Sequence, residues 1–210
     1  MENIEKIRSR IGNHFPKPID NKGSYSVLIP LIEVDGELHI IYERRAKTLK
    51  RQPYEVSFPG GAIELGETPE EAAVRETAEE LLIDESKIEV IGRSDFIVKP
   101  EVLIIYTYVG IIKEDIKKIV PNRDEVEYIF TVPLKYLMEN EPKSFPIELK
   151  ITRTSGFPYD LIPDAKKYEK RMEIETVEAY QYEDDLIWGF TAKTTRAFIE
   201  ILKNKKSSLA

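Results

Sequence analysis

Short runs of apolar residues, separated by turn residues, recur through most of the chain and predict β-strands. The runs are rich in Ile, Val, Tyr and Phe, which favour strands. Between the first two runs, the pair Asp35-Gly36 predicts a tight hairpin. The expected strands are Ser24–Ile32, Glu37–Tyr42, Glu55–Phe58, Lys87–Ile91, Asp95–Val98, Val102–Ile112 and Val126–Val132.

Helical spacing of apolar positions predicts four helices among these strands. They are expected at Asn3–Ile11, from Pro69 onward, at Pro133–Met138 and at Gly189–Lys203. Strands and helices mix without regular βαβ alternation, which favours an α+β fold with a mixed β-sheet packed between helices. For the last helix we expect core contacts from Phe190, Ala197, Ile201 and Leu202, with Trp188 just before it as a core aromatic.

The apolar pattern weakens between residues 139 and 175, where four prolines occur within 24 residues. We interpret this part as an insertion that contains a hairpin. A chain of 210 residues suits one domain. We therefore expect a single domain over 1–210, with its core at about 23–139 and 176–203 and the insertion at about 140–175.

The helix from Pro69 has a well-marked start. Thr68 is a good N-cap, Glu71 completes a capping box, and proline suits the first helical position. At 100° per residue, one side of the helix is acidic and the opposite side apolar. The acidic side carries Glu76, Glu79 and Glu80, and the apolar side carries Val74, Thr77, Ala78 and Leu81.

The three carboxylates need a physical reason, because like charges at this spacing each destabilise an isolated helix by about 0.2–0.5 kcal/mol. Arg75, four residues before Glu79, relieves part of this repulsion. Most such clusters are solvated surfaces. Here the preceding Gly60-Gly61 pair and the spacing favour a site for a hard divalent cation, which prefers oxygen ligands.

Composition narrows the chemistry. The chain has no cysteine and two histidines, which excludes thiolate chemistry and argues for an oxygen-bound metal. A net charge of −7 argues against nucleic-acid binding. No apolar run reaches the roughly 18–20 residues of a membrane span, and the N-terminus lacks an apolar signal segment. We therefore expect a cytoplasmic protein with no membrane partner.

Residues 58–83 resemble the Nudix box, G-x5-E-x7-R-E-U-x-E-E-x-G-U, where U is a bulky apolar residue. The positions in register are Gly61, Glu67, Arg75, Glu76, Glu79, Glu80 and Ile83. Two positions depart from the motif: Thr77 replaces an apolar residue, and Leu82 replaces the glycine that ends the helix. A left-handed conformation at Leu82 would cost roughly 1 kcal/mol.

The resemblance implies an α/β/α Nudix-like sandwich and a diphosphate hydrolase that uses Mg²⁺ or Mn²⁺. It implies that Arg75 orients Glu67 or a helix carboxylate rather than touching the substrate. A further carboxylate, for which we favour Glu125, is expected from a distant loop. The implied metal ligands are the Gly61 carbonyl, Glu76, Glu79 and Glu80, and the candidates for activating water are Glu79, Glu80 and Glu125.

A second motif lies just upstream. Residues 41–61 resemble the sequence L-L-T-x-R-[SA]-x3-R-x3-G-x-V-x-F-P-G-G that marks coenzyme A pyrophosphatases within the family, and residues 186–202 resemble the closing helix of that subfamily. The matches are Arg45, Ala46, Val56, Phe58, Pro59, Gly60 and Gly61. The departures are Ile41, Tyr42 and Glu43 in place of Leu-Leu-Thr, Lys50 in place of arginine and Tyr54 in place of glycine.

This second resemblance implies that coenzyme A or acyl-coenzyme A is cleaved to adenosine 3′,5′-bisphosphate and 4′-phosphopantetheine or its acyl form. Two alternatives stay open: hydrolysis of another diphosphate such as ADP-ribose or a dinucleotide, and a catalytically silent binding module. The expected partner is a small molecule, and a homodimer is allowed for. The residues expected to bind substrate are Arg45, Lys50, Phe58 and Gly60, with Arg44 or Arg51 as further anion contacts and Tyr54 narrowing the pocket.

Overall fold

The structure, a computed structural model, describes residues 3–14, 19, 23–99, 103–151, 161, 163 and 171–203. Much of the expected insertion, and Val102 at the start of one expected strand, lie outside these residues. Within the described ranges, no helix has the length and apolar character needed to cross a membrane.

Eight strands of the described chain form one mixed sheet, with β3-β2-β1-β7-β5 as its main order. β1 and β7 run parallel, and the other pairs are antiparallel. The expected hairpin joins β1 to β2, with Asp35 and Gly36 both at positive φ. The strands are β1 (Gly23–Val34), β2 (Glu37–Arg45), β3 (Val56–Ser57), β4 (Gly60–Ala62), β5 (Ile88–Arg93), β6 (Ile97–Lys99), β7 (Leu103–Ile112) and β8 (Val126–Pro133).

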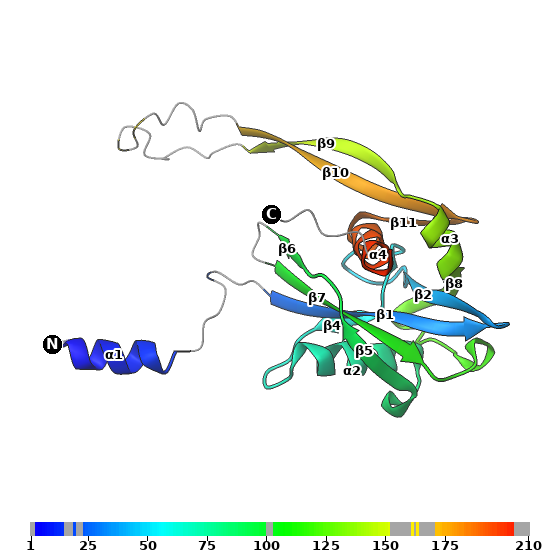
Figure 1. Cartoon of the computed structure of the whole chain (residues 1–210), viewed down its shortest axis with the longest axis horizontal. Coiled ribbons are helices and arrows are strands. Elements are labelled where there is room, and N and C mark those ends of the chain that lie inside the picture. Colours follow the sequence, from blue (N-terminus) through cyan, green and yellow to red (C-terminus); the bar gives the residue numbers. More distant parts are fainter. Residues whose placement is uncertain are drawn as a thin grey trace.

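Helices cover both faces of this sheet (Figure 1). Along β2, Ile41 packs in a cluster with the helix α2, whereas its neighbours Ile40 and Tyr42 pack in a cluster with α4. This alternation is what a strand buried on both faces requires. The expected α+β class and α/β/α layering are confirmed. The helices are α1 (Ile4–Gly12), α2 (Pro69–Leu81), α3 (Leu134–Glu139) and α4 (Gly189–Leu202), with short 3₁₀ turns at Glu85–Lys87 and Ile116–Lys118.

A second, three-stranded antiparallel sheet lies beyond α4 (Figure 1). It consists of β9 (Lys143–Ile151), β10 (Arg171–Tyr182) and β11 (Asp185–Trp188). β9 lies in the expected insertion and pairs with β10, but β10 continues past residue 175 to Tyr182, so this strand pair extends beyond the bounds expected for the insertion. Arg196 of α4 holds β10 in place through a 2.8 Å ion pair with Glu178.

The expected buried side of α4 is wrong. Ile201 and Leu202 are 46% and 41% exposed. The buried side chains are instead Ala192, Thr194, Thr195, Phe198 and Ile199. Thr195 can be buried because its hydroxyl oxygen lies 3.0 Å from the hydroxyl of Tyr42 and donates to the Thr191 carbonyl, so the position needs no apolar residue.

The central strand β1 changes its neighbour along its length. Tyr25–Val27 pair with β4, whereas Leu31–Val34 pair with β2. At the change, the Leu28 N–H donates to the carbonyl of Pro59, at 3.0 Å. This fork brings the Gly60-Gly61 segment against the sheet, next to α2.

Candidate active site

The helix α2 begins as its sequence predicts. The Thr68 hydroxyl accepts from the Glu71 N–H at 3.2 Å, and the Glu71 carboxylate accepts from the Thr68 N–H at 2.8 Å. At the other end, Leu82 is left-handed, with φ 49°, and its N–H donates to the Ala78 carbonyl. Leu82 thus adopts the conformation for which the motif has glycine, at a cost of roughly 1 kcal/mol.

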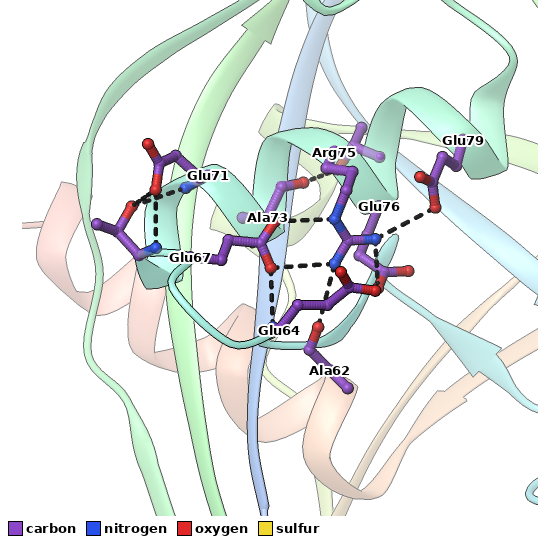
Figure 2. A network of polar contacts seen from close by, with 10 residues as sticks. Ala62, Glu64, Glu67, Glu71, Ala73, Arg75, Glu76 and Glu79 are labelled. Carbon is purple, nitrogen blue, oxygen red and sulfur yellow. Dashed lines mark hydrogen bonds and ion pairs between the residues drawn. The ribbon is translucent and has the colours of Figure 1, made fainter.

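Arg75 is the centre of the polar network on the outer side of α2 (Figure 2). Its guanidinium donates to both carboxylate oxygens of Glu67, at 2.8 and 3.2 Å, and to the Ala62 carbonyl at 3.1 Å. It also pairs with Glu76 at 2.9 Å and Glu79 at 3.2 Å. The hydrogen bonds from Arg75 are the main reason that the pKa of Glu67 is lowered. Arg75 therefore contacts Glu67 and also the helix carboxylates of Glu76 and Glu79, the two kinds of partner that the motif implied.

Glu76 lies against Gly61. A Cβ atom at residue 61 would be 2.2 Å from the carboxyl carbon of Glu76, so glycine is needed for this approach. Burial raises the pKa of Glu76, the bond to Arg75 opposes the rise, and the charges of Glu79 and Glu125 add to it. The site thus collects negative charge around a glycine turn.

Glu80 is buried rather than on an outer face with Glu76 and Glu79. Only 3% of it is exposed, and its carboxylate accepts the Gly60 N–H at 2.8 Å. The expected convergence of the three helix carboxylates is not observed, because Glu79 turns to Arg75 while Glu80 turns to Gly60. Among the described residues, no three acidic or histidine side chains are already arranged to hold a metal ion.

Glu43 is an acidic residue of the site that our sequence analysis did not single out. It is fully buried on β2, and one carboxylate oxygen accepts from the Ser57 hydroxyl at 2.8 Å. Burial raises the pKa of Glu43 to about 7, and the charge of Glu125 adds to the rise. Burial and the neighbouring Glu43 raise the pKa of Glu80 as well. The alternation of side chains along a β-strand could have revealed Glu43, since it lies two residues after Ile41 and therefore faces α2.

Glu125 lies in the turn directly before β8, as expected. The Ala46 N–H donates to its carbonyl at 2.7 Å, and the nearby Asn122 N–H donates to the Glu80 carbonyl at 2.8 Å. The charge of Glu125 acts on both Glu43 and Glu76. The structure therefore brings this distant loop to the carboxylates of α2.

A cavity of about 450 Å³ opens next to these carboxylates. Its lining includes Gly60 and Gly61 together with the cationic side chains of Arg45 and Arg51. Phe58 forms part of its wall while stacking on Tyr42 in the core, with ring centroids 5.0 Å apart. Three of the four residues expected to bind substrate, Arg45, Phe58 and Gly60, thus border one cavity.

The remaining expected contacts lie elsewhere. Lys50 is exposed and does not line the cavity. Arg44 is engaged by Asp185 and by the Tyr128 hydroxyl, so its charge is already balanced inside the protein. The expected narrowing of the pocket by Tyr54 is wrong: its ring packs under Arg44, 5.0 Å from the guanidinium carbon, and its left-handed backbone, φ 62°, explains the glycine of the motif.

The expectation that Trp188 is a core aromatic is also wrong. The side chain is 42% exposed and lines the cavity, together with Phe190. The following residue, Gly189, has φ 64° and is the first residue of α4. An amphipathic indole at the mouth of a polar and apolar cavity suits contact with a ligand.

Comparisons with known proteins agree on one family. A NUDIX domain model matches residues 24–153. Nudix hydrolase 3 of Caenorhabditis elegans is 27% identical over 194 residues, covering 91% of this chain and 78% of that protein. The peroxisomal coenzyme A diphosphatase NUDT7 of Mus musculus is 33% identical over 132 residues, which are 62% of this chain and 55% of the mouse protein.

The fold has a match among solved structures. A MutT/nudix family protein from Enterococcus faecalis superposes with a TM-score of 0.53 at 11% identity, covering 96% of this chain and 70% of the other. At that identity the likeness concerns the fold alone.

Proposed function

We propose that this chain, which belongs to the NUDIX domain family, is a divalent-metal-dependent hydrolase that cleaves the diphosphate of coenzyme A or acyl-coenzyme A. The products would be adenosine 3′,5′-bisphosphate and 4′-phosphopantetheine or its acyl form. The matched segment covers just over half of the mouse relative. We therefore base the proposed substrate and activity on the residues of this chain and not on the name of that relative. The observation that carries the proposal is the cavity. It is lined by Arg45 and Arg51 and also by Gly60 and Gly61, which contact Glu80 and Glu76.

The donor set fits Mg²⁺ or Mn²⁺. Carboxylates and carbonyls are the ligands these ions prefer, and Glu76 and Glu80 both carry raised pKa values because they are buried among other acids. We propose that Glu76, Glu79, Glu80 and the Gly61 carbonyl hold the metal, with Glu79 released from Arg75. Bound metal would neutralise the diphosphate and lower the pKa of an attacking water.

The protein's own groups would do the rest. The water oxygen attacks one phosphorus, the bridging P–O bond breaks, and two phosphate monoesters leave. Glu79, Glu80 and Glu125 remain the candidates to accept the proton of the water. Arg75 would keep Glu67 and the helix carboxylates in position, which makes it a positioning residue.

The cavity would bind the parts of the substrate beyond the diphosphate. Arg45 lines it, and its Nε atom is buried without a hydrogen-bond partner among the described residues. A buried, unused guanidinium donor suits a phosphate oxygen, and Arg51 adds a second cation at the same cavity. Coenzyme A offers such a group in its 3′-phosphate. Trp188 and Phe190 add aromatic surface for an uncharged part of the ligand.

Product identification by mass spectrometry tests the proposal. The protein is incubated with Mg²⁺ or Mn²⁺ and, in parallel, with coenzyme A, ADP-ribose and NADH. We expect adenosine 3′,5′-bisphosphate from coenzyme A, well above AMP release from the other two. AMP from ADP-ribose or NADH with coenzyme A intact would overturn the substrate and keep the hydrolase chemistry. No turnover of any substrate would favour the silent binding module.

Two further expectations stay predictions. The mouse relative is named as a peroxisomal protein, so the cytoplasmic location is a prediction to be measured by localising this chain in its own cells. A homodimer is testable by light scattering.

A further inference from the structure

Glu43 differs from the other acids of the site in its origin. It comes from β2, in the sheet, rather than from α2 or a loop. Along β2 the side chains alternate between the two helix layers, and Glu43 shares the α2 side with Ile41. It is therefore directed toward the buried side of α2, where Glu80 lies.

One carboxylate oxygen of Glu43 makes no hydrogen bond within the described part of the protein. Ser57, its register partner on β3, donates to Oε1 at 2.8 Å, while Oε2 is buried and has no hydrogen-bond partner there. Leaving a buried carboxylate oxygen unpaired is costly, so such atoms require an explanation. A cation would supply the missing partner, because an ionised carboxylate can only accept.

The neighbourhood of that oxygen already contains other metal donors. The charge of Glu43 acts on Glu80, and the charge of Glu125 acts on Glu43. The positive charge of Arg45 also acts on Glu43, but Arg45 lines the cavity and leaves its own Nε unpaired. Glu43 thus has an unpaired oxygen and, among the described residues, no cation bonded to it.

We propose that Glu43 is a further metal ligand of this site, acting beside Glu80 through its unpaired oxygen. The inference rests on the metal dependence of the proposed function. The coenzyme A pyrophosphatase motif has threonine at this position, so the extra carboxylate is a property of this chain that the motif does not supply. A fully charged ligand from the sheet would strengthen metal binding before any substrate arrives.

The competing explanation makes the opposite prediction. If Glu43 only repels Glu80 and keeps a proton between them, removing its charge leaves metal affinity unchanged or increases it. If Glu43 is a ligand, removing its charge weakens binding. The sign of the change therefore decides between the two roles.

The test is a titration of the protein with Mn²⁺ alone at about pH 7.5. The electron paramagnetic resonance signal of the free ion reports how much Mn²⁺ is bound. We expect Glu43→Gln to raise the Mn²⁺ dissociation constant at least about 10-fold. Glu89→Gln is the matched control, because Glu89 is an exposed acid on β5 paired with Lys113, and its loss changes net charge equally. If E43Q folds poorly, E43T, which restores the residue of the related motif, gives the same comparison.

An E43Q dissociation constant within about twofold of the unmodified protein, or lower, overturns the inference. Absence of Mn²⁺ binding by the unmodified protein overturns it together with the metal dependence of the proposed function. Weakened binding in E43Q supports the inference even where coenzyme A is not the substrate, so the two proposals fail separately.

Discussion

The carboxyl group of Glu76 lies in the space that a side chain at Gly61 would occupy, with 2.2 Å between its carbon and an added Cβ. The contact is with the far end of a flexible side chain, so an alanine at residue 61 can be accommodated if Glu76 moves. Gly60 differs, because a Cβ there would meet the Ser26 carbonyl oxygen at 2.3 Å in the backbone of β1.

Gly61→Ala should therefore affect function far more than stability. We expect the unfolding free energy to change by about 1 kcal/mol or less and turnover to fall at least about 10-fold, because the displaced Glu76 no longer serves the metal. Gly92→Ala is the control, since no atom lies within 4 Å of an added Cβ and its φ is not positive. Equal turnover in both variants would refute the role of Glu76.

Glu79→Gln and Glu80→Gln should each lower turnover by about 100-fold or more, because each loses a proposed ligand or base. Far-ultraviolet circular dichroism should be unchanged, since the amide oxygen of a glutamine at residue 80 can still accept the Gly60 N–H. Glu70→Gln, at an acid in the first turn of the same helix, should keep full activity. Normal turnover in both site variants would make the metal assignment wrong.

The metal-free protein should lose stability as pH rises from about 4.5 to about 7. Burial raises the pKa of Glu43 from its ordinary 4.5 to about 7 in the folded protein, so the folded state binds more protons in this window. Urea unfolding in a chelator should show a loss on the order of 2 kcal/mol across the window. Glu43→Gln should flatten the slope and be the more stable protein at about pH 7.5. A slope of the opposite sign would contradict the raised pKa.

Trp188→Ala should weaken substrate binding with little effect on chemistry. The indole lines the cavity and contributes no carboxylate, so we expect KM for coenzyme A to rise about 10-fold and kcat to change less than about threefold. Leu186→Ala removes a similarly exposed side chain of β11 that does not line the cavity. Steady-state kinetics of the two variants make the comparison, and equal KM values would remove Trp188 from the binding site.

Leu82→Gly should stabilise the protein by about 0.5–1 kcal/mol, because glycine adopts the left-handed conformation without steric cost. The side chain is 62% exposed, so little packing is lost. At Leu65, which is fully exposed and not at positive φ, the same substitution should be neutral or destabilising. Thermal unfolding of the two variants, both with chelator, measures the difference.

The sequence predicted well those elements whose ends are set by residues close together in the chain, such as a helix cap or a tight turn. The helix α2 follows from Thr68, Pro69 and Glu71, because caps act within four residues of the chain. The β1–β2 hairpin follows from Asp35-Gly36 for the same reason. The side chains that α2 buries were predicted less well, since Glu80 lies on the buried side and meets Gly60, a partner set by tertiary structure.

Features that depend on distant partners were missed. Thr195 is buried because Tyr42, on another element, supplies a hydroxyl partner. Trp188 is the N-cap of α4 and lines a cavity whose other walls come from distant parts of the chain. In the sequence, Glu43 was only a departure from a motif. Its place among the acids of the site follows from its electrostatic interaction with Glu80 in the folded chain. The pattern of residues therefore predicted a group of acids on α2 and before β8, and it did not predict how their side chains face one another.

The fork in β1 has a consequence for how this site can diversify. The cavity borders Tyr25 and Val27, on the stretch of β1 where its neighbour is β4 rather than β2. Main-chain hydrogen bonds fix that fork, so exchanging the lining side chains would reshape the hollow and leave the fork in place. The main chain thus sets the position of the cavity beside the proposed metal site, and substitutions of the lining side chains would change which ligand fits.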